Sequence, residues 1–335
     1  MNIFIISPNP IWGGAATANM SIAEMLAKTH KVYYNDEYNI VNIPQVIYDS
    51  YPVHKLKDSR KLEIYIIENK IDVVIWGVAM TIPYYRKAIK MLKNKGVVNC
   101  VLFHSLSISR NFKGVLMEWL IAYSLKNVNH LVFVSKYTDE SWSKYKVVRR
   151  HLNHHTIYNP IAIGDCMTKE LTYKIGFVGR FSPEKQPEKF ARLSEFDNKK
   201  YIAWGDGPLL TTLKNKYRKV EFMGQSSCQD SIYKSFDILV MTSEFENCPM
   251  VILEAWKYGI PCIAPAIGGI PEIVIDGYAG RLYTDYSQEF ILSCIKDIQD
   301  NYDQYRDNAF RVVQKFSFDN IEECWNQIIN SKHNK

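Results

Sequence analysis

The chain has 335 residues, a length that favours two domains of ordinary size over one. Hydrophobic residues make up 47% of it and charged residues 23%, which argues against a disordered or fibrous protein and is typical of a globular enzyme. The net charge of +6 is uneven: residues 1–165 hold 20 Lys and Arg against 12 Asp and Glu, and residues 166–335 hold 21 against 23. This asymmetry indicates an anionic partner for the first half, with a solvated lysine-rich surface as an equally weighted alternative.

The seven cysteines are predicted to be free thiols in a reducing compartment, because their number is odd and no CxxC or CxH pair predicts a metal site. The N-terminus lacks the basic segment and the long apolar run of a signal peptide. No stretch approaches the roughly 18 consecutive apolar residues of a membrane-spanning helix. We therefore expect a cytoplasmic protein, and we leave open a peripheral contact with the inner face of the plasma membrane.

Short apolar strands alternate with helical segments in the first half of the chain. Strands are expected at residues 2–7, 72–77, 98–105 and 130–135, and helices at 15–30 and 83–96. Continuous apolar strands separated by helices are typical of a parallel sheet covered on both faces. The segment 112–128 is apolar on more than one face, for which core packing is favoured over lipid contact. Residues 149–155 are interpreted as a basic surface loop, with acceptor or membrane contact as the less favoured alternative.

The same alternation begins again near residue 170. Strands are expected at residues 173–180, 201–207, 220–224, 237–243 and 261–266. The linker lies around 157–172, where Pro160 disfavours helix at Asn159. The sequence thus predicts an α/β protein with two Rossmann-like, doubly wound parallel-sheet domains facing a central cleft, where ligands bind at the carboxyl ends of the strands.

Two glutamates, Glu246 and Glu254, flank a predicted helix start in the second half. Pro249 is suited to the first helical position, and the helix is expected to end near Gly259. The free N–H groups and the dipole of such a helix start favour an anion. Carboxylates beside an anion site accept hydrogen bonds from hydroxyls, so the arrangement predicts a ligand with an anionic centre flanked by hydroxyls, such as a nucleotide sugar. A surface acid and a solvated helix glutamate would be the explanation if the pair stood alone.

Cations and glycines elsewhere strengthen this interpretation. Arg180 and Lys185 follow a predicted strand, where two cations could hold a diphosphate. Gly205 lies in a predicted tight turn close to a ligand, and Gly13 and Gly14 lie in a turn that would face phosphate. Each glycine turn alone is weak evidence.

With these residues, the chain resembles the family 4 glycosyltransferases, which are retaining enzymes with the two-domain GT-B fold. The second half carries the resemblance most specifically, in stretches that occur in the family's order: GFVGRFSPEKQPEKF, WGDGPLL, VEFMGQ and SEFENCPMVILEAWKYGIPCIAPAIGGIPEIVIDGYAGRLY. The first half resembles the family more loosely, in GGAATANMSIAEMLA, VFVSKYT and IYNPI. Two positions depart from the family pattern: Asn247 stands where glycine is usual, and Asn159 is followed by proline rather than glycine.

The resemblance implies a role for each matching residue. Residues 1–165 would bind the acceptor, with a C-terminal helix at about 316–332 packing back on them, and residues 166–315 would bind the donor. His104, Glu246, Arg180 and Lys185 would be catalytic. Glu254 would hydrogen-bond the ribose. The remaining donor-binding residues would be Gly13, Gly14, Gly205, Met223, Gln225, Asn247, Cys248, Pro249, Met250 and Val251.

The implied reaction moves a sugar, with retention, from a UDP-sugar, or secondly a GDP-sugar, to a glycan or lipid-linked acceptor in bacterial surface polysaccharide synthesis. No DxD motif is present, so we expect no metal and no cofactor. A nucleotide-sugar 2-epimerase of the same fold and a non-catalytic partner subunit remain as alternatives. A nicotinamide-dependent oxidoreductase is disfavoured, because residues 7–17 do not form GxGxxG. We expect no nucleic-acid partner.

Overall fold

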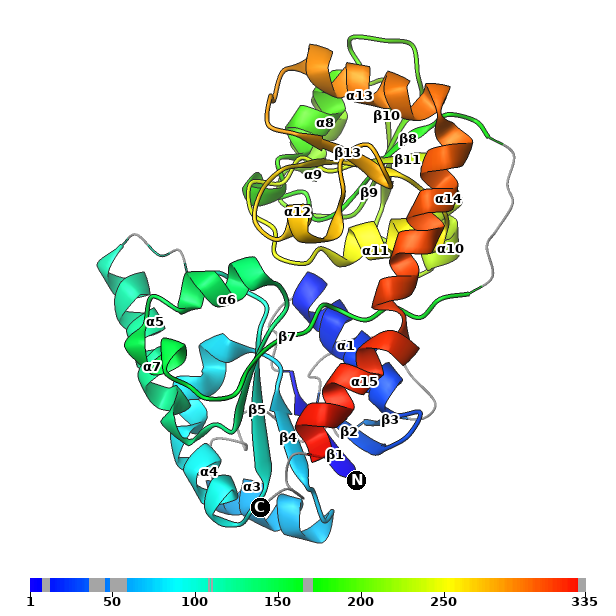
Figure 1. Cartoon of the computed structure of the whole chain (residues 1–335). Coiled ribbons are helices and arrows are strands. Elements are labelled where there is room, and N and C mark those ends of the chain that lie inside the picture. The colour runs from blue at the N-terminus through cyan, green and yellow to red at the C-terminus, as the bar shows by residue number, and fades with distance from the viewer. Residues whose placement is uncertain are drawn as a thin grey trace. The chain divides into compact units, whose positions relative to one another are not determined.

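The computed structural model describes residues 1–7, 13–35, 46–48, 59–107, 109, 111–164 and 171–330 (Figure 1). The chain divides into two compact units. Unit 1 comprises the described residues up to Ala162 together with those from Phe318 onward. Unit 2 runs from Ile163 to Ser317, so the chain returns to unit 1 after completing unit 2.

Unit 1 is built on a parallel seven-stranded sheet in the order β3-β2-β1-β4-β5-β6-β7. Its strands are β1 (Asn2–Ile6), β2 (Lys31–Asn35), β3 (Val46–Tyr48), β4 (Val73–Trp76), β5 (Val98–Phe103), β6 (His130–Phe133) and β7 (His154–Thr156). The central strands are buried along their length, as expected for a sheet with helices on both faces. The strand order reverses between β1 and β4, and ligands of such sheets bind at the carboxyl ends of the strands beside this point.

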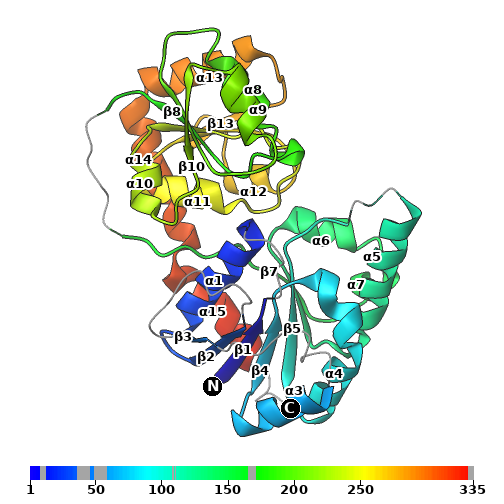
Figure 2. The same cartoon turned by 180° about the vertical axis from the view of Figure 1, so that it is seen from behind.

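Alternate side chains of the central unit 1 strands pack against different helices. Phe4 and Ile6 face a core shared with α3 (Ser59–Glu68), α4 (Ile82–Asn94) and α5 (Phe112–Ser124). Ile3 and Ile5 face a core shared with α1 (Gly14–Leu26) and α15 (Phe318–Ile329). The C-terminal helix α15 therefore completes the core of unit 1, and both views show it beside α1 (Figures 1 and 2). The shorter helices of unit 1 are η1 (Ala79–Thr81), η2 (Leu125–Asn127), α6 (Lys136–Trp142) and α7 (Lys146–Arg149).

Unit 2 is built on a parallel six-stranded sheet in the order β10-β9-β8-β11-β12-β13. Its strands are β8 (Ile175–Val178), β9 (Tyr201–Trp204), β10 (Val220–Gly224), β11 (Ile238–Val240), β12 (Cys262–Pro265) and β13 (Gly280–Tyr283). Its helices are η3 (Pro183–Lys185), α8 (Pro187–Leu193), α9 (Leu210–Lys216), α10 (Gln229–Tyr233), α11 (Met250–Lys257), α12 (Ile270–Ile273), α13 (Gln288–Asp300), α14 (Tyr302–Val313) and η4 (Gln314–Phe316). The order reverses between β8 and β11.

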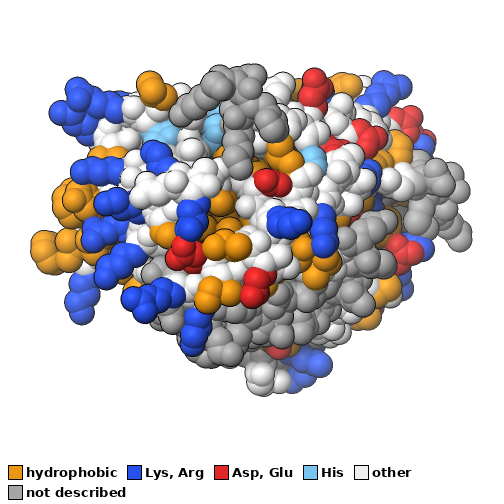
Figure 3. Space-filling view, turned by 90° about the horizontal axis from the view of Figure 1, so that it is seen from below, with side chains coloured by type: hydrophobic (Ala, Val, Ile, Leu, Met, Phe, Trp, Pro, Cys, Tyr) orange, Lys and Arg blue, Asp and Glu red, His pale blue; other side chains and the backbone are white. Residues whose placement is uncertain are grey.

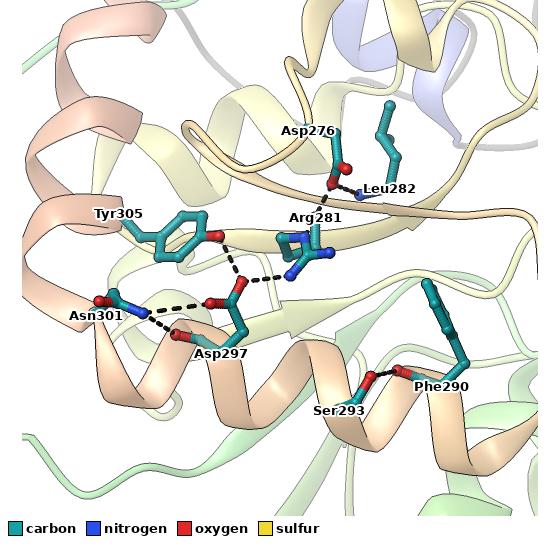
Figure 4. A network of polar contacts seen from close by, with 8 residues as sticks. All are labelled: Asp276, Arg281, Leu282, Phe290, Ser293, Asp297, Asn301 and Tyr305. Atoms are coloured by element: carbon teal, nitrogen blue, oxygen red, sulfur yellow. Dashed lines mark hydrogen bonds and ion pairs between the residues drawn. The ribbon is translucent and has the colours of Figure 1, made fainter.

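A polar network fastens the edge strand of unit 2 to its last helices (Figure 4). Arg281 on β13 pairs with Asp297 on α13, and its Nε lies 3.0 Å from Asp276 Oδ1. Tyr305 on α14 donates a 2.7 Å hydrogen bond to Asp297. Burial alone would raise the pKa of Asp297, but the bonds from Tyr305 and Arg281 outweigh it and lower that pKa. The ionised carboxylate thus joins one strand and two helices.

The sequence predicted most central strands and the edge strand β10, and it missed β2 and the other three edge strands. Strands β2, β3, β7 and β13 were not expected, and β7 falls within the segment 149–155 that was interpreted as a loop. The sequence of β7, His-His-Thr, lacks the apolar run that signals a buried strand, because its side chains are only half-buried. Its pairing with β6, at Leu131–His154 and the following positions, makes it a strand all the same.

The edge of the unit 1 sheet is expected to weaken as the pH falls. His130 Nδ1 lies 3.0 Å from His155 Nε2, and burial together with the neighbouring His155 and His151 lowers the pKa of His130 to about 4. Between the ordinary histidine pKa of about 6.5 and that value, the unfolded chain binds a proton that the folded chain does not. The free energy of unfolding should therefore fall as the pH is lowered from about 7 to about 4. Hydrogen exchange of the backbone amides of β6 and β7 would measure this loss of stability. Exchange rates that change with pH only as those of an unfolded peptide do would contradict the prediction.

Candidate active site

The carboxyl ends of β8 and β11 bring the predicted cations and the first glutamate together. Lys185 follows β8 and Glu246 follows β11, at the point where the strand order reverses. Lys185 Nζ lies 2.6 Å from Glu246 Oε1, although the two residues are 61 positions apart in the chain. The side chain of Glu246 is 9% exposed and that of Lys185 is 32% exposed. An ammonium group has three donors, so Lys185 can hold Glu246 and still donate to an incoming anion.

Backbone and side-chain hydrogen bonds hold the two loops in register. Thr242 donates through Oγ1 to the carbonyl oxygens of Lys185 and Gln186, at 3.0 and 2.9 Å. The amide of Glu244 donates to the carbonyl of Glu184 at 2.8 Å. The ion pair therefore rests on a fixed backbone rather than on two independent loops. Thr242 was not expected from the sequence, where it is one polar residue after an apolar strand.

Arg180 lies just beyond the carboxyl end of β8 and is exposed. Among the described residues, its guanidinium makes no hydrogen bond or ion pair, although its charge helps to lower the pKa of Glu184. A fully charged, planar donor is thus available at the edge of the sheet beside Lys185. One guanidinium group can donate two parallel hydrogen bonds to the oxygens of a phosphate. This fits the diphosphate-binding role predicted for Arg180.

The helix after Glu246 begins one residue later than predicted. Pro249 caps α11 with φ −69° and ψ 117°, and Met250 is the first helical residue. No described side chain caps this end, and the first amides, including those of Met250 and Val251, have no hydrogen-bond acceptor within the helix. Cys248, Pro249 and Met250 are buried, so their side chains present little surface to a ligand. Asn247 is half-buried beside them.

Glu254 lies on the second turn of α11, as the sequence predicted, and two side chains of α10 hold its carboxylate. Tyr233 donates a 2.6 Å hydrogen bond to Oε2, and Gln229 donates a 3.2 Å bond to Oε1. Burial raises the pKa of Glu254. Each carboxylate oxygen retains a second acceptor site for a hydroxyl. Since α10 follows β10, Glu254 is tied to the segment after Met223 and Gln225, two exposed residues predicted to border the base.

Two glycines are required by the close approach of loops at this edge. Gly205 has φ +134°, and a Cβ there would lie 1.9 Å from the carbonyl oxygen of Gly179. Gly205 was predicted from the sequence to lie close to a ligand, whereas in the structure it is required by the packing of the loops after β8 and β9. Gly268, which was not singled out, has φ +56°, and a Cβ there would lie 1.8 Å from the carbonyl oxygen of Glu246. It allows the turn before α12 to support the Glu246 backbone.

A second set of predicted residues lies in unit 1. His104 follows β5, and its Nε2 lies 2.9 Å from Oδ1 of Asn19, which is fully buried on α1. Asn19 donates through Nδ2 to Ser7 Oγ at 2.8 Å and to the carbonyl of Gly77 at 3.0 Å. A Cβ at Gly77 would lie 2.5 Å from Asn19 Nδ2, so this position must remain glycine beside Asn19. One amide thus joins the carboxyl ends of β1, β4 and β5.

Asn19 also determines which nitrogen of His104 carries the proton. Its amide nitrogen faces the Gly77 carbonyl, which only accepts, so its oxygen must face His104. Burial lowers the pKa of His104 to about 4, so the ring is neutral at pH 7. Nε2 then bears the hydrogen and Nδ1 is the acceptor. The sequence analysis missed Asn19, whose only signal was a polar residue on the buried face of an apolar helix.

This tautomer gives a direct prediction. Nitrogen-15 correlation spectra should show His104 as a neutral ring protonated at Nε2 from pH 8 down to about pH 5. Asn19→Asp should raise the pKa of His104, because a carboxylate 2.9 Å away stabilises the imidazolium. An Nδ1-protonated ring in the natural protein would contradict this assignment, and His151, whose Nε2 lies 3.0 Å from the carbonyl of Val128, gives a reference signal in the same spectra.

Gly13 and Gly14 form the start of α1, with Gly13 as the cap. A Cβ at either position would have no neighbour within 4 Å among the described residues, so packing against those residues does not explain why they are glycine. Residues 8–12, which precede them in the predicted phosphate-facing turn, lie outside the described residues.

Comparison with known proteins gives the family of the second unit. Residues 168–310 match the model of the glycosyl transferases group 1 family. Unit 2 is a glycosyl transferases group 1 domain. The predicted membership of this family is confirmed, while the narrower assignment to family 4 stays a prediction.

Relatives of the group 1 domain support the same placement. The O-antigen biosynthesis glycosyltransferase WbnH of Escherichia coli is 31% identical over 168 residues, which are 49% of this chain and 48% of WbnH. An Escherichia coli protein named UDP-Gal:alpha-D-GlcNAc-diphosphoundecaprenol alpha-1,3-galactosyltransferase is 25% identical over 176 residues, covering 48% and 42% of the two chains. The chain thus matches about half the length of these relatives.

The whole chain also shares its fold with a solved structure. HepE of Anabaena, solved in complex with UDP-glucose, superposes with a TM-score of 0.80 at 16% identity and covers all of both chains. The predicted GT-B fold with two Rossmann-like domains is confirmed.

Two structural features are absent from the described part of the chain. No helix there is long and apolar enough to cross a bilayer. No group of three or more His, Cys, Asp or Glu side chains is arranged there to hold a metal ion. Independence of metal remains a prediction.

Proposed function

We propose that the chain is a retaining glycosyltransferase that uses a nucleotide sugar, with UDP-sugars favoured and GDP-sugars second. The observation that carries this proposal is the Lys185–Glu246 pair beside Arg180, at the reversal point of a group 1 domain. Two cations suit a diphosphate, and a carboxylate held beside them suits sugar hydroxyls. The UDP-glucose bound to HepE, a protein of the same fold, is consistent with a UDP-sugar.

The residues of unit 2 would stabilise the leaving diphosphate without a metal. As the bond between the anomeric carbon and the phosphate oxygen breaks, negative charge grows on the diphosphate. Arg180, Lys185 and the first amides of α11 are fixed donors that can meet this charge, and each ~1.4 kcal/mol they supply is about tenfold in rate. Glu246 would contact the transferred sugar, and Glu254 the ribose.

The acceptor oxygen would form its bond on the face from which the diphosphate leaves. Its proton would pass to an oxygen of the leaving phosphate, which becomes more basic as the bond breaks. We assign the neutral His104 to a hydroxyl of the donor sugar.

We further propose a glycan or lipid-linked acceptor in bacterial surface polysaccharide synthesis, bound by unit 1, at the cytoplasmic side of the membrane. The names of the two Escherichia coli relatives, one an O-antigen enzyme and one acting on a diphosphoundecaprenol-linked sugar, support this setting. Hexosyl and N-acetylhexosaminyl donors both fit the proposal.

The test is product analysis with UDP- and GDP-sugars, with and without lipid-linked sugar diphosphates. Transfer should give a glycosidic bond of the donor's own anomeric configuration by nuclear magnetic resonance. Conversion of the sugar nucleotide without acceptor would indicate the epimerase instead, and nucleotide binding without any turnover would indicate a partner subunit.

A further inference from the structure

Helix α5 carries an exposed apolar face in addition to its buried one. The exposed residues recur at helical spacing along its whole length: Phe112, Val115, Leu116, Trp119, Leu120 and Tyr123. Phe112 is 82% exposed and Trp119 is 53% exposed. Trp119 and Tyr123 stack with ring centroids 5.5 Å apart. Intervals of three and four residues place these side chains on one side of the helix.

The opposite side of α5 already accounts for its place in the core. Ile121 and Ala122, with Leu125 just beyond the helix, are buried against the sheet. Glu118 accepts hydrogen bonds from Ser107 at 2.7 Å and Tyr145 at 2.9 Å, which anchors the same side. The sequence analysis favoured core packing over lipid contact for 112–128. The structure shows that core packing uses only one side and leaves the other uncovered among the described residues.

The surroundings of this exposed face are basic. Together, α4, α5, η2 and α7 contain eight lysines and arginines and a single acid, Glu118, which is buried. The cations are Arg86, Lys87, Lys90, Lys93, Lys113, Lys126, Lys146 and Arg149. Lys126 lies 4.2 Å and Arg86 5.7 Å from the centre of the Tyr123 ring. Figure 3 shows hydrophobic side chains with Lys and Arg around them on the side where Figure 1 places α4 and α5.

We propose that the outer face of α5 docks on an anionic lipid surface, with the helix lying in the plane of the membrane interface. An apolar stripe containing tryptophan, with lysines and arginines around it, is the combination that binds such surfaces. The aromatic residues would enter the interface and the cations would meet lipid phosphates.

A second copy of the chain fits this face less well. A symmetric dimer brings the same patch of both copies together, so the basic rims would meet each other. An anionic surface neutralises these charges instead. The proposed function supplies only the reason for docking, which is to bring unit 1 to a lipid-borne acceptor. The docking itself rests on the residues of α5 and the cations around it.

The test is sedimentation of the full chain with vesicles of phosphatidylcholine alone or with 30% phosphatidylglycerol. Binding should require the anionic lipid and should weaken at high salt. Trp119→Glu should reduce the partition coefficient at least tenfold. Phe196→Glu is the matched control, since Phe196 is 50% exposed on unit 2, and it should bind as the natural protein does. Lys113→Ala with Lys126→Ala should weaken binding without altering the apolar face.

Absence of binding to anionic vesicles, or equal binding by Trp119→Glu, would overturn the inference. So would a concentration-dependent dimer in sedimentation velocity that Trp119→Glu abolishes, because the face would then join two copies. Nucleotide titration of the same samples separates the two proposals: Trp119→Glu should bind the nucleotide normally, and failure of nucleotide binding leaves the vesicle result unaffected.

Discussion

Arg180→Ala is expected to lower kcat/KM for donor turnover by about 10²–10³-fold, the usual loss when one fixed donor to a developing negative charge is removed. The free energy of unfolding of unit 2 should be unchanged, because Arg180 is exposed and its side chain makes no hydrogen bond or ion pair among the described residues. Release of nucleoside diphosphate from the sugar nucleotide measures the turnover. Chemical denaturation followed by hydrogen exchange in unit 2 measures the stability.

Arg192→Ala is the matched control for Arg180→Ala. Arg192 is an exposed arginine of the same unit, at the end of α8, away from the carboxyl ends of the strands. The Arg192→Ala substitution should leave donor turnover unchanged. Equal kinetics for Arg180→Ala and Arg192→Ala would remove Arg180 from the diphosphate site.

Lys185→Ala should damage both turnover and stability. It removes a second donor to the diphosphate, and it also leaves the Glu246 carboxylate, only 9% exposed, without its cation. Breaking a fully buried pair costs about 3–5 kcal/mol, and because Lys185 is partly exposed we expect about 2–3 kcal/mol here. Turnover should fall by at least about 10²-fold.

The double variant Lys185→Ala with Glu246→Gln separates the two effects. A neutral amide needs no cation, so most of the lost stability should return, while turnover stays low because both site residues are changed. Stability as low in the double variant as in Lys185→Ala would show that the ion pair is not the source of the loss. Recovery of turnover would exclude both residues from the reaction.

The fold could be predicted from sequence where the physical signal was local. Buried central strands such as 98–103 consist of apolar residues, and a proline marked the start of α11 to within one residue. The edge strand β7 gave no such signal, because it is held by pairing with β6 rather than by apolar side chains of its own.

The sequence predicted the residues of the candidate site but not the contacts between them. Arg180, Lys185 and Glu246 were each named from sequence, but no spacing could show that Lys185 and Glu246 meet at 2.6 Å. The role of Asn19 could not be predicted from the sequence either, because its partners Ser7, Gly77 and His104 follow three different strands. Such contacts depend on how the strands are ordered in the sheet, which periodicity does not encode.

In the proposed reaction, fixed side chains and backbone amides of unit 2 bind the diphosphate of a nucleotide sugar without a metal. Calorimetric titration of the full chain with UDP and GDP, repeated in EDTA, tests it most directly, with Arg180→Ala beside the natural protein. One of the two nucleotides should bind with an affinity that EDTA does not change and that Arg180→Ala weakens at least tenfold. Binding of neither nucleotide, or binding that EDTA abolishes, would contradict it.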